Sequence, residues 1–397
     1  MICSATSSIS RVFEELRSFE RQEVSGVRPD RFDYDKYLQK SEQIIARTEG
    51  FALGKAKEFF PVIQWSHGEG AFGVNSRYRD VMLEAQLEGL TKTLEADTDW
   101  VPFIEPWHGV GIYAQAFGCP FEWRDDSSPW TYPIVKNIDD LRAIEKPDIE
   151  KCEMLQYVLE TIKYFDEKTG GRIYMSSTDT QSPLDTATLI MDTDFFFYAA
   201  MDYPEDLHRL ISNITDVIIE FTKMQRELMS RPITPGHNSW CHPKLPGLGL
   251  SEDCMCMVGP DFFDEFARPY NERIAETFGG VAIHSCGVWN QNYEIIRRLQ
   301  GLVEVDLAIH QDNDPTPNLP EVVRDGLRGS GFIVKVRWPG HAMELLDRIY
   351  APGLRLMWEI LWDDDPTARQ RYYDAAKRRY DVLHGSALSC GWNCLEL

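Results

Sequence analysis

Apolar and polar positions along the chain follow two alternating patterns. Short runs rich in β-branched and aromatic residues end in polar, glycine or proline positions, and longer stretches with apolar residues at 3.6-residue spacing follow them. The short runs predict eight strands: PVIQW (61–65), VPFIE (101–105), RIYMSS (172–177), LGLSE (248–252), VAIHS (281–285), VEVDLAI (303–309), FIVKV (332–336) and LRLMWEI (354–360). Eight strands with helices between them are typical of a closed parallel barrel rather than an open sheet.

The longer stretches predict helices, and several of them begin with Pro, Asp or Ser and end at Gly. They cover residues 76–96, 150–171, 204–229, 260–280, 293–300, 318–327, 342–350 and 365–385. We therefore expect an α/β protein with a single (β/α)₈ TIM-type barrel over residues 61–384. Residues 1–60 are expected to form extra N-terminal helices packed on the barrel, and residues 385–397 a C-terminal tail.

In barrels of this kind the chemistry lies where the strands end and the βα-loops begin. His284 and Cys286 stand two residues apart at the end of the fifth predicted strand. Alternate residues of an extended segment point the same way, so the imidazole and the thiolate can bind one ion. Zinc prefers nitrogen and sulfur ligands, and a catalytic zinc keeps one position open. The spacing alone is weak evidence, but its place before Gly287 at a strand end favours a zinc site.

A zinc site needs a third protein ligand, and Glu359 is our first choice. The eighth strand, which carries Glu359, neighbours the first strand across the closed barrel and opens into the same mouth, and a carboxylate is an accepted zinc ligand. Glu359 can equally be a polar residue of the rim. The sequence leaves four other candidates open: Asp253, His310, and the tail cysteines Cys390 and Cys394.

Further polar and aromatic residues fall at predicted strand ends. The candidates for catalysis are His67, His108 and Asp179, with Asp253 as a support for the metal shell. Tryptophans near the same strand ends predict an aromatic-lined pocket for a flat or methylated substrate or cofactor: Trp65, Trp107, Trp240 and Trp338. Each of these residues also has a structural interpretation, as a satisfied loop histidine, a rim carboxylate or a core tryptophan.

The net charge of the chain limits the classes of partner that it can bind. Lys plus Arg number 41 against 63 Asp plus Glu, a net charge of −22. This field repels phosphate backbones and anionic lipid surfaces, so we expect a small-molecule substrate, no nucleic acid and no membrane. No apolar run is long enough to span a bilayer, and the nine cysteines form no disulfide framework, so we expect a cytoplasmic protein with reduced thiols.

The stretch GLGLSEDCMCMVGPDFFDEFARPYNERIAETFGGVAIHSCG (247–287) resembles the uroporphyrinogen decarboxylase superfamily, and more closely its zinc-dependent methylcobamide:thiol methyltransferase branch. IYAQAFGCPFEW, DTQSPLDTA and residues 202–211 are similar to the family too. The resemblance implies a (β/α)₈ barrel, often a homodimer, with His284 and Cys286 as a His-x-Cys zinc motif. It also implies a thiol acceptor of the coenzyme M type, which takes a methyl group from a methylated corrinoid carried by a partner protein.

Two departures from the family refine this expectation. The methyltransferase branch has a third cysteine ligand after the last strand, where this sequence reads LMWEILWDDDP, so another residue must complete the site. The decarboxylase proper has an arginine-rich segment after the first strand, where this sequence reads QWSHGEGAFG. We therefore do not expect uroporphyrinogen decarboxylase activity.

Three functions follow. The leading one is zinc-dependent methyl transfer, linked to a corrinoid, at the barrel mouth. The second is a metal-free decarboxylase or lyase of the same fold, in which His67, His108 and Asp179 act on a small carboxylated or aromatic substrate, and Lys335 or Arg337 binds the anion. The third is a non-catalytic barrel that binds a corrinoid protein.

Overall fold

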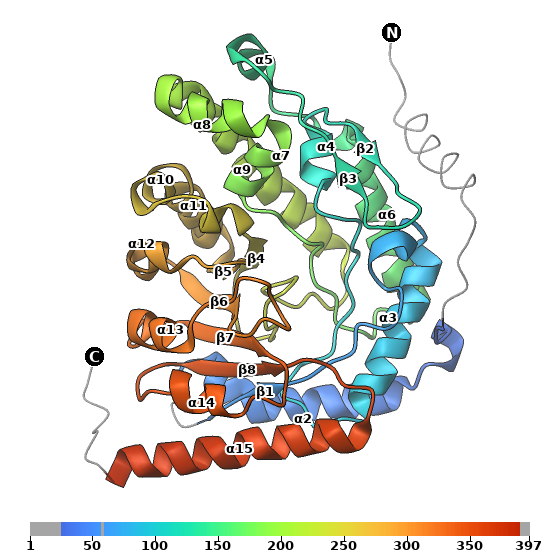
Figure 1. Cartoon of the computed structure of the whole chain (residues 1–397). Coiled ribbons are helices and arrows are strands. Elements are labelled where there is room, and N and C mark those ends of the chain that lie inside the picture. Colours follow the sequence, from blue (N-terminus) through green and yellow to red (C-terminus); the bar gives the residue numbers. More distant parts are fainter. Residues whose placement is uncertain (1–24, 57–58, 390–397) are drawn as a thin grey trace.

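The computed structural model describes residues 25–56 and 59–389, and its core is a parallel sheet that curves into a barrel (Figure 1). The strand order is β1-β8-β7-β6-β5-β4, with β1 paired to β8. The strands are β1 (Val62–Ile63), β4 (Leu248–Ser251), β5 (Val281–His284), β6 (Leu302–Ala308), β7 (Ile333–Trp338) and β8 (Leu356–Ile360). The six confirm six of the eight predicted strands.

The two remaining predicted strands close the barrel through isolated bridges. Ile104 pairs in parallel with Met175, and Gln181 pairs in parallel with Ser251 of β4. On the other side, Asp99 donates its backbone N–H to the Val62 carbonyl in β1 at 2.9 Å. The predicted α/β barrel is thus confirmed, although the walls at 101–105 and 172–177 are less regular than their sequences suggest.

Helices cover the outside of the barrel, and Figure 1 shows α10 to α14 following one another along β4 to β8. In the first half of the chain the helices are α2 (Tyr34–Ala52), α3 (Arg79–Leu94), α4 (Ile112–Ala116), α5 (Ile138–Ala143), α6 (Glu153–Thr169), α7 (Pro183–Ile190), α8 (Thr193–Asp202) and α9 (Pro204–Leu228). In the second half they are α10 (Pro260–Phe266), α11 (Arg268–Phe278), α12 (Tyr293–Arg298), α13 (Pro320–Leu327), α14 (Glu344–Ile349) and α15 (Pro366–Ser389). A short antiparallel hairpin, β2 (Phe121–Glu122) and β3 (Trp130–Thr131), decorates the rim.

The predicted helix over residues 260–280 is two helices. Helix α10 ends at Phe266 and α11 begins at Arg268, so that Pro269 falls in the first turn of α11. A proline there has no N–H to donate to the turn before it and its ring clashes with that turn, which separates the two helices. Most other helix boundaries agree with the sequence within a few residues.

Alternation within the strands divides apolar from polar side chains. In β6, Val305 and Leu307 pack into the main core under the helices, whereas Glu304 and Asp306 face the barrel interior. In β8, Trp358 packs outward and Glu359 inward. Because successive residues of a strand point to opposite faces, a polar residue at every second position collects inside the barrel.

A second apolar cluster closes the barrel at the amino-terminal ends of the strands. It contains Phe51, Ile63, Trp100, Trp240, Ile333 and Met357. Trp240 comes from the segment between α9 and β4, and its ring meets that of Phe51 of α2 edge-on at 5.9 Å. The predicted N-terminal extension therefore contributes α2 to the barrel floor, while residues 1–24 lie outside the described part of the chain.

The C-terminal helix α15 lies beside α2 in Figure 1 and contacts β1. It continues to Ser389, past the boundary predicted at 384, and the division of the chain into domains stays a prediction. Within the described residues, no helix combines the length and apolar character that crossing a membrane requires.

Candidate metal centre at the barrel mouth

Three ligand-type side chains meet where β4 and β5 end. His284 is the last residue of β5, Cys286 stands two residues later, and Asp253 lies in the turn after β4. One donor atom of each lies within 4.8 Å of the other two. Asp253 Oδ1 accepts the backbone N–H of Cys286 at 2.7 Å, and this bond joins the turn after β4 to the loop after β5.

The buried imidazole of His284 is oriented by Asp306. The two residues are register partners on β5 and β6, and Nδ1 of His284 is hydrogen-bonded to the Asp306 carboxylate. A carboxylate at Nδ1 keeps the proton there and leaves the lone pair of Nε2 free. That Nε2 lies 3.5 Å from Cys286 Sγ and 3.9 Å from Asp253 Oδ1.

Asp306 is itself held in its ionised form. Burial alone would raise the pKa of Asp306, but Lys335 and Arg337 hold this pKa well below its usual range. Lys335 Nζ lies 2.9 Å from Asp306 Oδ1, and Arg337 Nε lies 3.3 Å from Oδ2. The Asp306 and Glu359 carboxylates in turn raise the pKa of the buried Lys335 against the cost of its burial, so Lys335 stays charged.

Glu359, our first choice for the third ligand, is occupied by other partners. Its Oε1 accepts the Trp65 indole N–H at 2.8 Å, and its Oε2 is paired with Lys335. The carboxylate that lies beside His284 and Cys286 is that of Asp253, which the sequence analysis named both as an alternative third ligand and as a support for the metal shell. The alternative ligands Cys390 and Cys394 lie outside the described residues.

Asp185 positions the turn that presents Asp253. Its two carboxylate oxygens accept the backbone N–H groups of Asp253 and Cys254, both at 2.7 Å. The neighbouring Glu252 points into the protein, where it accepts hydrogen bonds from Ser182 and Asn271. Burial raises the pKa of Glu252 to about 7. Sequence reasoning missed Asp185, although the DTQSPLDTA segment that carries it was noted as family-like.

A second polar cluster lies inside the barrel on the opposite walls. His237 Nδ1 lies 2.7 Å from Glu105 Oε1, and its Nε2 lies 3.7 Å from Asp179 Oδ2. Burial alone would lower the pKa of His237, but the Asp179 and Glu105 carboxylates raise it to about 9. Asp179 also accepts the Trp107 indole N–H at 3.2 Å and the Ser251 hydroxyl at 3.2 Å. His237 is a site residue that the sequence analysis missed, because its segment has no recognisable pattern.

The remaining sequence candidates divide between the interior and the outer layers. His67 is exposed beside Trp65, with ring centroids 3.7 Å apart, and both border a small cavity of about 20 Å³. His108 is not brought to the mouth, because its ring is buried in hydrogen-bond contact with Ser76 and Thr161 of the outer layer. Burial lowers the pKa of His108 to about 4, so it is neutral and structural.

Two of the four predicted pocket tryptophans are core residues. Trp240 belongs to the barrel floor. Trp338 is fully buried in the outer core, where its ring packs 5.0 Å from that of Trp358 and its N–H is donated to the Ala342 carbonyl. Trp65 and Trp107 instead bond to carboxylates inside the barrel. Of the four tryptophans predicted to line a pocket, Trp65 and Trp107 are therefore the two that lie inside the barrel.

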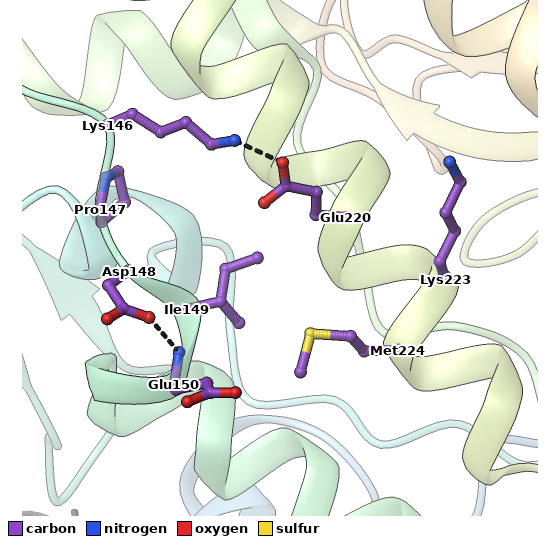
Figure 2. A pocket seen from close by; sticks show the side chains of 8 residues that line it. All are labelled: Lys146, Pro147, Asp148, Ile149, Glu150, Glu220, Lys223 and Met224. Carbon is purple, nitrogen blue, oxygen red and sulfur yellow. Dashed lines mark hydrogen bonds and ion pairs between the residues drawn. The ribbon is translucent and has the colours of Figure 1, made fainter.

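A larger groove, of about 560 Å³, lies away from the strand ends, between the loop after α5 and helix α9 (Figure 2). Lys146 crosses its edge to pair with Glu220, and Ile149 and Met224 line its base. The groove shares no residue with either polar cluster of the barrel interior.

Comparison with known proteins supports the fold and the family resemblance. The family model for uroporphyrinogen decarboxylase (URO-D) matches residues 108–242. Among solved structures, a methyltransferase from Methanosarcina mazei is similar with a TM-score of 0.60 and 14% identity, over 85% of this chain and 99% of that one. No curated protein matches the sequence. The stretch 247–287, which carried most weight in the sequence analysis, lies outside the matched range. The resemblance to the uroporphyrinogen decarboxylase superfamily is thus confirmed, by the family match over residues 108–242 and by a shared fold over most of the chain.

Proposed function

We propose that this chain is a zinc-dependent methyltransferase that works with a methylated corrinoid, and that Asp253, His284 and Cys286 hold the zinc. The observation that carries the proposal is that Nε2 of His284, on the side of the ring away from Asp306, faces a thiol and a carboxylate at the carboxyl ends of barrel strands. The fold shared with a methanogen methyltransferase supports the same reaction class.

The three side chains fit the preferences of zinc. Their N, S and O donors are those that zinc accepts, and three protein ligands leave one position for a substrate. Asp306 supplies the carboxylate that ligand histidines commonly have at their other nitrogen. When bound, zinc would lower the pKa of a substrate thiol and so provide a nucleophile near neutral pH.

In the proposed reaction a methyl group passes, formally as CH₃⁺, from the methylcorrinoid to the thiol. The carbon–cobalt(III) bond of a methylcorrinoid breaks, a carbon–sulfur bond forms, cobalt(I) keeps the electron pair and the thiol proton is released. This chain would orient the acceptor: Asp253 is about half exposed at the mouth, and Trp65 and His67 form an aromatic wall on the side of β1. Lys335 and Arg337 would offset the negative charge of the interior carboxylates next to the anionic sulfur.

Zinc analysis and a methyl-transfer assay test the proposal together. The full chain, purified without chelator, is expected to contain zinc at the mouth and to transfer methyl from methylcobalamin to a member of a thiol panel. Cys286→Ala removes a ligand and is expected to abolish transfer. It should lower metal affinity by more than the roughly 10–100-fold that is typical when a residue hydrogen-bonded to a ligand is lost. Cys256→Ala, which removes another exposed thiol, is the matched control. Full activity of Cys286→Ala would overturn the proposal.

The second candidate, a metal-free decarboxylase or lyase, is favoured by a different observation. His237 lies as a cation between Glu105 and Asp179, and Lys335 and Arg337 lie on the opposite wall, so the interior has both a proton store and groups that bind a carboxylate. This candidate predicts that Cys286→Ser leaves turnover intact and that His237→Gln lowers it. A corrinoid-protein partner, a homodimer and a cytoplasmic location remain predictions of the sequence analysis, as does the non-catalytic corrinoid-binding barrel.

A further inference from the structure

We propose that the mouth carries a second divalent-metal site, formed by His310, Asp312 and His341 on its rim. One donor atom of each residue lies within 4.8 Å of the other two. In the described part of the chain this group and the Asp253–His284–Cys286 group are the two that meet this criterion, and they share no residue. The inference does not depend on the proposed function.

The three ligands come from loops that follow neighbouring strands. His310 and Asp312 lie in the tight turn after β6, and His341 lies in the loop after β7, which pairs with β6. Asp312 Oδ2 is central: it lies 3.6 Å from His310 Nδ1 and 3.9 Å from His341 Nε2. The two rings meet edge to face, with centroids 5.7 Å apart and planes at 88°. Two imidazoles therefore converge on one carboxylate.

One nitrogen of His310 is engaged within the turn. Its Nδ1 accepts the backbone N–H of Asp312 at 3.2 Å, and an ion bound at Nδ1 would replace this bond, because the nitrogen has one lone pair. His341 and Asp312 are about half exposed, which leaves an ion a path from solvent and room for water ligands. Two nitrogens and one oxygen favour a transition ion such as zinc over magnesium or calcium, which prefer oxygen ligands alone.

The same turn reaches the metal centre at the mouth. Asp314, two residues after Asp312, accepts the backbone N–H of Gly287 at 2.7 Å, and Gly287 directly follows Cys286. A metal on His310, Asp312 and His341 would therefore fix the loops after β6 and β7 and stiffen the support of Cys286. The site is thus structural in character, with an ion holding two rim loops together.

The stoichiometry of bound zinc tests the proposal. Metal-free full-length protein is dialysed against Zn²⁺ alone, freed of unbound ion and measured by mass spectrometry for zinc per chain. We expect two equivalents for the wild type and the loss of one in the double variant His310→Ala/His341→Ala. Gln311→Ala, an exposed neighbour in the same turn, is the matched control and is expected to keep both.

Cobalt substitution separates the two sites by their ligands. Cys286→Ala is expected to bind one equivalent of Co²⁺ without a thiolate-to-cobalt charge-transfer band, and this equivalent should vanish when His310 and His341 are also replaced. If the wild type and His310→Ala/His341→Ala bind equal amounts of metal, the rim residues are a His–Asp ion pair and the proposal is wrong. If zinc is lost with the rim histidines but not with Cys286, the rim site stands and the proposed function fails.

Discussion

At the scale of single residues, Asp306 decides what His284 can do. A histidine has two nitrogens, and the one that carries the proton cannot bind a metal. The contact between Asp306 and His284 Nδ1 assigns the proton to that side, while Lys335 keeps Asp306 ionised. The orientation of the nitrogen that we propose to bind zinc thus depends on a residue 22 positions further along the chain.

Asp306→Asn tests this arrangement. An asparagine can donate its N–H to Nδ1, and the proton of the imidazole would then move to Nε2, toward Cys286. We expect zinc affinity to fall roughly 10–100-fold, measured by competition with a chelator. Glu304→Gln is the control: it lies on the same strand, and burial raises the pKa of Glu304 to about 8, so glutamine resembles the form present at pH 7. Unchanged zinc affinity in Asp306→Asn would contradict the role of Asp306.

At the scale of elements, α15 packs against β1, the shortest strand of the six-stranded sheet. Lys377 of α15 reaches the fully buried Asp99 at 2.7 Å and the Phe60 carbonyl at 2.6 Å. Asp99 also accepts the backbone N–H of Val62 and bonds to Arg47 of α2. One buried carboxylate therefore joins two helices to the first strand.

Lys377→Met is expected to destabilise the protein by about 2–4 kcal/mol, because the buried Asp99 carboxylate loses one of its two cationic partners and keeps Arg47. Urea unfolding followed by circular dichroism measures the change. On the same helix, Arg379→Met removes an ion pair with Asp347 in which both side chains are more than one-third exposed. This control is expected to cost less than about 1 kcal/mol. Equal effects of the two substitutions would show that the Asp99 contact is not special.

At the scale of the whole molecule, the barrel interior is a set of compensated charges. One wall holds Asp306, Lys335 and Glu359, and the other holds Glu105, His237 and Asp179. A chain with 63 acidic and 41 basic residues thus places cations at its centre. Because these groups are mostly buried, their protonation is coupled to folding.

The pKa of His237 predicts how stability varies with pH. It is raised to about 9 in the folded protein, against about 6.5 in an unfolded chain. The stabilisation is therefore complete below pH ~6.5 and is lost as pH rises through about 9. We expect the stability advantage of the wild type over His237→Gln to fall by on the order of 2–3 kcal/mol across this range. Urea unfolding of both proteins at several pH values measures it, and an advantage that grows with pH would refute the charge assignment.

Much of this protein follows from local patterns. Period-two and 3.6-residue spacing located six strands and most of the helices, and the alternation of these elements predicted the barrel. His284 and Cys286 could be found because their spacing acts within one strand end, where both side chains point the same way. The break between α10 and α11 was not predicted, although Pro269 stands in the sequence, because helical periodicity continues on both sides of it.

Which carboxylates lie beside His284 and Cys286 could be read only from the tertiary structure. Asp253 and Asp306 lie beside His284 from two other segments of the chain, and Asp185 supports the Asp253 turn from a third. Sequence spacing does not show which of these carboxylates lies next to the imidazole. Glu359 has the right residue type on the right strand, yet Trp65 and Lys335 occupy it. The sequence by itself determined the barrel and singled out His284 and Cys286 as candidate ligands, because both depend on local periodicity. Which polar groups pair inside the barrel was decided by packing across strands, because a charge in a closed interior is stable only beside the partner that the fold brings to it.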